Sequence, residues 1–175
     1  MPVTSSIFKQ YKKNISIFIE TGSYLGDGIA AALSAGFSMV YSIEFNPTNF
    51  YHCKGRFQGV SSVDIMQGSS VDNLKLLLPK INTSVLFWLD AHDNEDLPNG
   101  SYPLLDELEQ IKQHSIHTHT ILIDDRRLFK EGSRSLWGDV TENKVITKLK
   151  EINSNYNISL IDSSMFEKDI ILAEV

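Results

Sequence analysis

The sequence has little cysteine and no long apolar run. Cys53 is the only cysteine among 175 residues, which excludes an internal disulfide and favours a reducing compartment. No apolar stretch approaches the roughly 20 residues that a membrane-spanning helix needs. Residues 1–14 also lack the apolar centre of a secretory signal. We therefore expect a soluble, cytoplasmic protein without a membrane partner.

Basic charge is scarce as well. Lys and Arg together number 16 against 22 Asp and Glu, which gives a net charge of −6. A protein that binds a phosphate backbone usually carries a basic face, so a nucleic-acid partner is not expected. Charged residues, at 22%, are too few for a disordered chain, and 42% apolar residues suffice for a core. The length suits a single domain over residues 1–175.

What the sequence does contain is an alternation of strand-like and helix-like segments. Apolar, β-branched stretches predict strands at 15–21, 39–45, 62–68, 84–92 and 118–125. Helical spacing predicts helices between and after them, at 26–36, 46–57, 70–81, 103–114 and 141–154. The expected N-caps include Asn46, Ser70 and Thr141. Residues 93–102 and 126–138 are expected to be loops.

Strands that alternate with helices imply right-handed crossovers and a parallel sheet. The last two strand segments, 156–164 and 168–175, are too close for a helical crossover and should pair antiparallel. The predicted fold is α/β: a doubly wound, mostly parallel, seven-stranded sheet with a C-terminal antiparallel β-hairpin. Such sheets bind ligands beyond the carboxyl ends of their strands. Chemically capable residues gather there: Glu20, Glu44, Gly68, Asp90, His92, Asp124 and Asp125.

The segment FIETGSYLGDG, residues 18–28, places an acid and three glycines between the first strand and the first helix. Its spacing, G-x-x-x-G-x-G, differs from the dinucleotide fingerprint G-x-G-x-x-G. Glu20 would repel a pyrophosphate and suits a cationic ligand better. Glu44 ends the second strand, where an acid accepts hydrogen bonds from a ribose diol. Together these residues favour a nucleoside cofactor site over a helix-capping turn beside an ordinary paired acid.

In chain order, ETGSYLGDG, SIEF, QGSSVDNL and FWLDAH resemble the successive motifs of class I S-adenosylmethionine (SAM)-dependent methyltransferases. The resemblance extends from about residue 15 to the C-terminus. It implies that the glycine turn holds the methionine part of the cofactor, that Glu44 binds the ribose and that residues after the third strand contact adenine. The cofactor-binding residues so implied are Glu20, Gly22, Ser23, Tyr24, Gly26, Glu44, Gly68, Ser69, Ser70 and Asp90.

Carboxylates cluster after the fourth and fifth strands, which this topology makes neighbours. Crowded carboxylates repel one another, and a hard cation such as Mg²⁺ relieves that repulsion. The pattern is similar to the metal-dependent sugar O-methyltransferases of the macrocin O-methyltransferase-like type. That resemblance implies that Asp90, Asp124 and Asp125 bind Mg²⁺. It also makes Asp90 and His92 catalytic, with His92 as the base that takes a proton from the substrate hydroxyl.

Structural roles for the same residues stay open at this point. Asp124 caps the segment that follows it in one alternative, and Asp125 pairs with Arg126 or Arg127. Asp90 also ends the fourth strand of many class I enzymes that use no metal. His114, His117 and His119 are expected to be solvated at the opposite edge of the sheet. The loops 93–102 and 126–138 either close over the substrate or are ordinary surface loops.

The sequence thus predicts a SAM-dependent O-methyltransferase acting on a hydroxyl of a sugar or small metabolite, with Mg²⁺ as an optional second cofactor. A homo-oligomer is left open. Two alternatives remain. One is a non-catalytic module of the same fold that binds the cofactor or a partner. The other is a nicotinamide-dependent oxidoreductase, which the glycine spacing disfavours.

Overall fold

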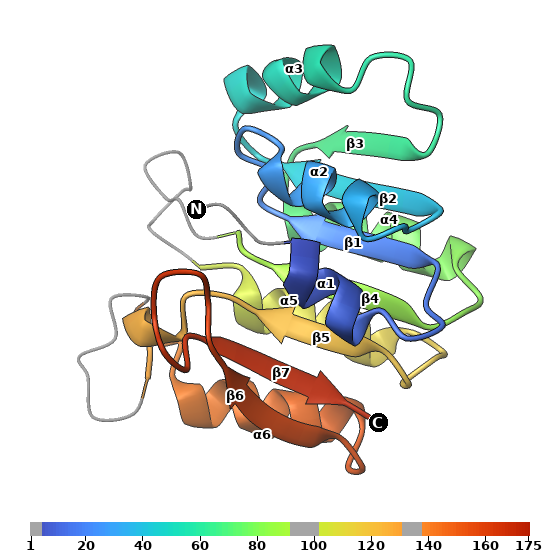
Figure 1. Ribbon diagram of the computed structural model, residues 1–175. Coiled ribbons are helices and arrows are strands. Elements are labelled where there is room, and N and C mark those ends of the chain that lie inside the picture. Colours follow the sequence, from blue (N-terminus) through green and yellow to red (C-terminus); the bar gives the residue numbers. More distant parts are fainter. Residues whose placement is uncertain (1–4, 92–101, 131–137) are drawn as a thin grey trace.

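The computed structural model describes residues 5–91, 102–130 and 138–175. They form one seven-stranded sheet with helices on both faces (Figure 1). The strands are β1 (Ile17–Thr21), β2 (Met39–Glu44), β3 (Val63–Gln67), β4 (Val85–Leu89), β5 (Thr120–Ile123), β6 (Asn157–Ile161) and β7 (Ile170–Glu174). The helices are α1 (Ser5–Tyr11), α2 (Asp27–Ser34), α3 (Pro47–Arg56), α4 (Ser70–Leu77), α5 (Leu104–Gln113) and α6 (Glu142–Ile152). Short 3₁₀ turns lie at η1 (Leu78–Lys80) and η3 (Arg126–Leu128).

The strand order is β3-β2-β1-β4-β5-β7-β6. The first five strands are parallel, and β7 runs antiparallel between β5 and β6. The predicted fold class, its mostly parallel sheet and its C-terminal hairpin are therefore confirmed. The order reverses beside β1, so the turns after β1 and β4 lie at the switch point where ligands of such sheets bind.

Two apolar cores hold the sheet between its helix layers. One core lies on the face covered by α1, α2 and α3, and includes Phe8, Ile29 and Cys53. The other lies under α4, α5 and α6, and includes Leu74, Leu108 and Leu149. The inner strands are buried on both faces, which explains why β4 and β5 are continuous apolar runs rather than alternating ones.

Helix α1 was not predicted from the sequence. Its one buried side chain, Phe8, lies 4.7 Å from the Phe18 ring and 5.3 Å from the Trp88 ring, measured between centroids. Tertiary packing of this single aromatic residue therefore accounts for a helix of only seven residues, a length that is marginal alone. No helix in residues 5–91, 102–130 or 138–175 is both long and apolar enough to cross a bilayer.

The N-caps are largely as predicted, with one correction. Asn46 accepts hydrogen bonds from Thr48 N and Asn49 N, and Thr141 caps α6. The cap of α4 is Ser69, whose side chain accepts from Asp72 N, and Ser70 is the first helical residue. The prediction of Ser70 as the cap was wrong by one position. Residues 69 and 70 are both serine, and only the backbone geometry shows which of them is the cap.

The expectation that His114 and His119 are solvated was also wrong. Both side chains are buried at the amino edge of the sheet, whereas His117 is exposed as predicted. His119 Nδ1 accepts from Val85 N at 3.1 Å, and its Nε2 lies 3.0 Å from His114 Nδ1. His114 Nε2 in turn lies 3.0 Å from the carbonyl oxygen of Ile81. Because each ring nitrogen has a partner, these polar side chains can be buried.

Candidate functional site

Two glycines in the turn after β1 are positions where other groups of the protein leave no room for a side chain. Gly22 has a φ of +84°, and a Cβ there would lie 2.5 Å from the carbonyl oxygen of Asp90. A Cβ on Gly28 would lie 1.7 Å from Glu20 Oε1. Both glycines therefore allow close contact with other protein groups, which brings Glu20 and Asp90 against the same turn. Gly26 serves as the N-cap of α2.

Glu20 lies beneath the turn rather than on the surface. Its side chain is 2% exposed, and Ser42 Oγ donates to its carboxylate at 2.5 Å. Ser23 Oγ lies 2.5 Å from Ser42 Oγ, which extends this hydrogen-bonded chain to the turn. Burial raises the pKa of Glu20 well above its ordinary value, although the Ser42 bond opposes this, and the charges of Asp90, Glu44 and Asp27 raise it further. Glu20 therefore lies among three further acids at this turn.

Glu44 joins three segments that the family resemblance assigns to the cofactor. Its carboxylate accepts hydrogen bonds from Tyr24 N at 2.7 Å and Asn46 N at 2.8 Å. Its own carbonyl accepts from Gly68 N at 2.9 Å. Burial raises the pKa of Glu44, and the Asn46 and Tyr24 amides act against that rise. The turn after β1, the end of β2 and the end of β3 are therefore fixed around one acid, while the Tyr24 side chain is exposed.

A second buried acid, Glu107 on α5, was missed by the sequence analysis. It is 1% exposed, and its Oε2 accepts from Thr21 Oγ1 at 3.4 Å, with Ser70 as a further side-chain donor. Burial raises its pKa to about 7. The signal was present in the sequence, because Glu107 occupies the same helical stripe as Leu104, Leu108 and Ile111. An acid in an apolar stripe indicates a buried polar contact.

The predicted acidic residues after β4 and β5 do lie at neighbouring strand ends. Asp90 N donates to Thr21 O at 3.1 Å, and Asp124 N donates to Leu89 O at 3.2 Å. Asp124 is 5% exposed, and no described residue donates a hydrogen bond to its Oδ1. Burial, followed by the charges of Asp90 and Asp125, raises the pKa of Asp124 to about 7. Several acids therefore lie close together at this edge, and one buried oxygen of Asp124 has no donor among the described residues.

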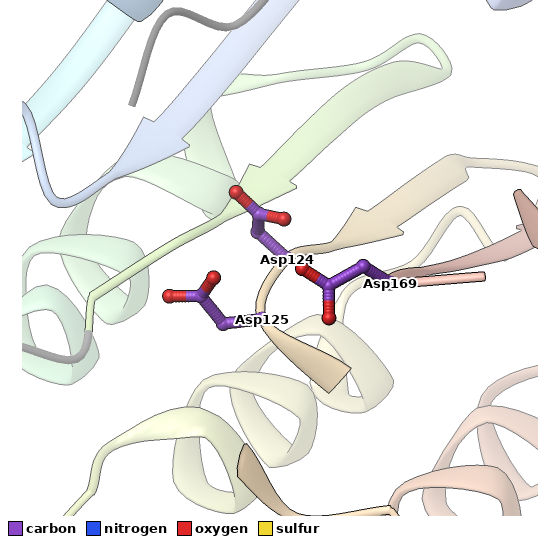
Figure 2. Close-up of side chains that lie close together, drawn as sticks. All are labelled: Asp124, Asp125 and Asp169. Atoms are coloured by element: carbon purple, nitrogen blue, oxygen red, sulfur yellow. The ribbon is translucent and has the colours of Figure 1, made fainter. Parts of the chain in front are cut away.

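The structure adds Asp169 to this group (Figure 2). One ligand atom from each of Asp124, Asp125 and Asp169 lies within 4.8 Å of the others. Asp169 comes directly before β7, whose antiparallel direction brings its start beside the end of β5. Among the described residues Asp90 is not part of this close group, although its charge acts on Asp124. The predicted metal ligands Asp90, Asp124 and Asp125 stay a prediction.

One of the structural alternatives for Asp125 is present in the fold. Arg127 Nη1 contacts Asp125 Oδ1 and lies 2.5 Å from Asp169 Oδ2. Arg126 instead pairs with Glu142 at 2.8 Å. The predicted base His92 lies outside the described residues, as do most of the predicted loop 93–102 and residues 131–137 of the predicted loop 126–138. The part of the second loop that is described includes η3.

Comparison with known proteins gives matches of fold. No family model and no curated protein sequence matches this chain. The O-methyltransferase TomG from Streptomyces achromogenes, solved in complex with SAM, is 12% identical over 98% of this chain and 78% of its own, with a TM-score of 0.65. The SAH-bound methyltransferase PaMTH1 from Podospora anserina is 14% identical over 97% and 76%, with a TM-score of 0.62. The O-methyltransferase from Bacillus cereus in complex with SAH is 11% identical over 98% and 78%, with a TM-score of 0.63. The chain therefore has the fold of class I SAM-dependent methyltransferases over nearly its whole length.

Proposed function

We propose that this chain, which has the class I methyltransferase fold, is a SAM-dependent O-methyltransferase formed by a single domain over residues 1–175. The observation that carries the proposal is the junction at Glu44. One carboxylate orders the turn after β1 and the start of α3, while the backbone carbonyl of the same residue orders the end of β3. The resemblance assigns the turn after β1 to methionine, Glu44 at the end of β2 to ribose, and the residues after β3 to adenine.

The charge of the site favours this cofactor over a dinucleotide. Burial raises the pKa of Glu20, and Asp90, Glu44 and Asp27 lie close enough to Glu20 for their charges to raise it further. Such a site stabilises the positive sulfonium of SAM and opposes a pyrophosphate. We assign Gly22, Ser23, Tyr24 and Gly26 to the methionine part, Glu44 to the ribose hydroxyls, and Gly68, Ser69 and Ser70 to adenine. Glu20 and Asp90 border the turn that holds the sulfonium.

The reaction we propose is methyl transfer to a hydroxyl of a sugar or small metabolite. The hydroxyl oxygen attacks the methyl carbon as the carbon–sulfur bond breaks, and the cofactor leaves as the neutral thioether. The hydroxyl proton passes to a base, for which His92 is the candidate, and Asp90 lies beside the reacting groups. The protein contributes mainly by holding the two reactants in line.

The acids after β5 fit a hard divalent cation. Asp124 keeps a buried oxygen without a donor among the described residues, and its raised pKa reflects surrounding negative charge in addition to burial. Asp90, Asp124 and Asp125 would hold Mg²⁺, which prefers carboxylate oxygens and water. When bound, the ion lowers the pKa of a coordinated hydroxyl. Mg²⁺ assistance therefore belongs to the proposal.

Calorimetric titration of the purified chain tests cofactor binding. We expect SAM to bind and NAD not to bind, and we expect Glu44→Ala to weaken SAM binding at least about tenfold through lost hydrogen bonds to a charged group. Asp64→Ala is the matched control, because it removes an exposed acid from the adjacent strand β3. Binding of NAD instead of SAM would favour the oxidoreductase alternative.

Turnover separates an enzyme from a non-catalytic module. With a panel of hydroxylated sugars and metabolites, formation of the demethylated cofactor should depend on acceptor. Asp90→Ala and His92→Ala should each abolish turnover, and His92→Ala should leave SAM affinity nearly unchanged. SAM binding without turnover on any acceptor would favour the binding module, and full turnover in both variants would end the catalytic assignment.

A further inference from the structure

The carboxylate cluster already contains a cation, the guanidinium of Arg127. Its Nη1 contacts Asp125 Oδ1 and lies 2.5 Å from Asp169 Oδ2, so one side chain bridges two of the three clustered acids. The carboxylates of Asp125 and Asp169 are both about 1% exposed. Charge-assisted bonds of this kind are among the strongest polar contacts in proteins. A second cation that binds the same two carboxylate oxygens must displace this one.

The position of Arg127 is set by contacts on several sides. Arg127 N donates to Asp169 Oδ1 at 2.9 Å, which holds the backbone beside the acid independently of the side chain. The guanidinium carbon lies 4.4 Å from the centroid of the Phe166 ring, close enough for a cation–π interaction. The Arg127 side chain is nevertheless 29% exposed, and Phe166 is exposed as well. The side chain can therefore leave without unfolding the turn.

The neighbouring arginine does not share this role. Arg126 Nε donates to Glu142 Oε1 at 2.8 Å, and its Nη1 donates to Lys168 O. Its charge is therefore committed outside the cluster. Arg127 supplies one positive charge to two carboxylates, and Asp124 retains a buried oxygen without a donor among the described residues. The cluster thus keeps ligand capacity that Arg127 does not use.

We propose that Arg127 is an internal cation that competes with a divalent metal ion for Asp125 and Asp169, so that metal binding requires the guanidinium to leave the cluster. Asp169 then acts as an anchor for Arg127 in the metal-free chain and as an additional candidate ligand beside Asp124 and Asp125. The exchange makes the metal affinity of this chain weaker than its carboxylates alone would give. This inference rests on the metal part of the proposed function.

Mn²⁺ binding measured by electron paramagnetic resonance of the free ion tests this, on the purified full chain without SAM or acceptor. Arg127→Gln should bind Mn²⁺ at least about tenfold more tightly than the unmodified chain, since two charge-assisted bonds no longer oppose the ion. Arg127→Lys keeps the charge but cannot bridge two carboxylates in the same planar geometry, so it should show an intermediate gain. The gain of Arg127→Gln should disappear when Asp124→Asn is added.

Matched controls separate competition from net charge. Arg126→Gln removes the same charge one residue away, and Lys168→Gln removes an exposed charge beside Asp169 without breaking the Glu142 pair. Both should change Mn²⁺ affinity less than about twofold, because Arg126 is paired with Glu142 outside the cluster and solvent screens the exposed Lys168. Thermal melts confirm that each variant is folded.

An Arg127→Gln affinity no higher than that of Arg126→Gln would overturn the inference, as would a loss of Mn²⁺ binding in Arg127→Gln. Because the assay contains no cofactor, its outcome is independent of SAM binding. A chain that fails to bind SAM but shows the Arg127→Gln gain overturns the proposed function alone. A chain that binds SAM without that gain overturns only the competition.

Discussion

The buried pair His114–His119 should make the protein sensitive to mild acid. Val85 N–H donates to His119 Nδ1, so the single proton of a neutral His119 must lie on Nε2 and point to His114 Nδ1. His114 then carries its proton on Nε2 and donates to Ile81 O. Both rings are therefore neutral in the folded chain. Adding a proton to His119 breaks its bond with Val85, in a site that excludes water.

The magnitude follows from the two pKa values of His119. Burial, together with the neighbouring His114, lowers the pKa of His119 from 6.5 to about 3 in the folded chain. The unfolded chain therefore binds a proton below pH 6.5 that the folded chain does not take up until pH 3. Stability from this group is complete above pH 6.5 and is lost as the pH falls. Between pH 7 and pH 5 the loss amounts to about 2 kcal/mol, at 1.36 kcal/mol for each unit.

Urea denaturation at pH 7, 6 and 5 measures this loss when the unmodified chain is compared with His119→Asn. The amide oxygen of asparagine preserves an acceptor for Val85 N–H and does not titrate. We expect His119→Asn to be less stable at pH 7 but to lose about 2 kcal/mol less on acidification to pH 5. The comparison is necessary because Asp124 and Glu107, whose pKa values are raised, change stability in the opposite direction.

His117→Asn is the matched control, since His117 is exposed in the same connection. Its unfolding free energy should follow the pH dependence of the unmodified chain. Parallel pH dependences for His119→Asn and the unmodified chain would refute the reasoning, because they would show that His119 takes up protons equally in the folded and unfolded states.

Three further predictions concern stability, each measured as the free energy of unfolding in urea. Gly28→Ala should lose about 1–3 kcal/mol by overpacking against Glu20, whereas Gly55→Ala, with nothing within 4 Å of the added Cβ, should gain up to about 1 kcal/mol in helix α3; equal effects would contradict the packing argument. Phe8→Ala should lose about 3–5 kcal/mol, because Phe8 is fully buried. The control Leu76→Ala should lose little, because Leu76 is exposed. An equally small loss for Phe8→Ala would show that α1 does not dock on the sheet. As the pH rises from 4.5 to 7, Glu107→Gln should become more stable relative to the unmodified chain by about 3 kcal/mol. The reason is that the raised pKa of Glu107 makes its ionised form costly in the fold. If the stability difference between the two chains does not change with pH, Glu107 is not a buried, titrating acid.

Local pattern predicted most of the fold. Five apolar segments and five helical segments follow from residue spacing, and the antiparallel ending follows from a connection too short for a helix. The observed elements are mostly one to four residues shorter at their ends than predicted. For example, β5 (Thr120–Ile123) ends directly before Asp124, where the polar edge of the sheet begins. Helix α1 escaped prediction because its stability depends on Phe8 meeting Phe18 and Trp88, which are distant in sequence.

The residues of the candidate site could be predicted from the sequence where they directly follow a predicted parallel strand. Glu20, Glu44, Asp90 and Asp124 lie at the carboxyl edge as expected from α/β topology. Asp169 could have been found from the same rule, because the start of an antiparallel strand meets that edge. The bridging by Arg127 could not, since spacing alone left Arg126 and Arg127 as equal partners for Asp125. Only the fold distinguishes them, by giving Arg126 to Glu142.

The insertion of β7 between β5 and β6 has a consequence for biosynthesis. Among the described strands β6 bonds only to β7, yet β6 emerges from the ribosome first. Until residues 170–174 follow, β6 lacks its hydrogen-bonding neighbour and the margin of β5 stays open. A premature stop codon after Ile161 would therefore leave the free backbone hydrogen-bonding groups of β5 and β6 exposed at two strand edges. Such edges promote aggregation and make the polypeptide a target for quality-control proteases.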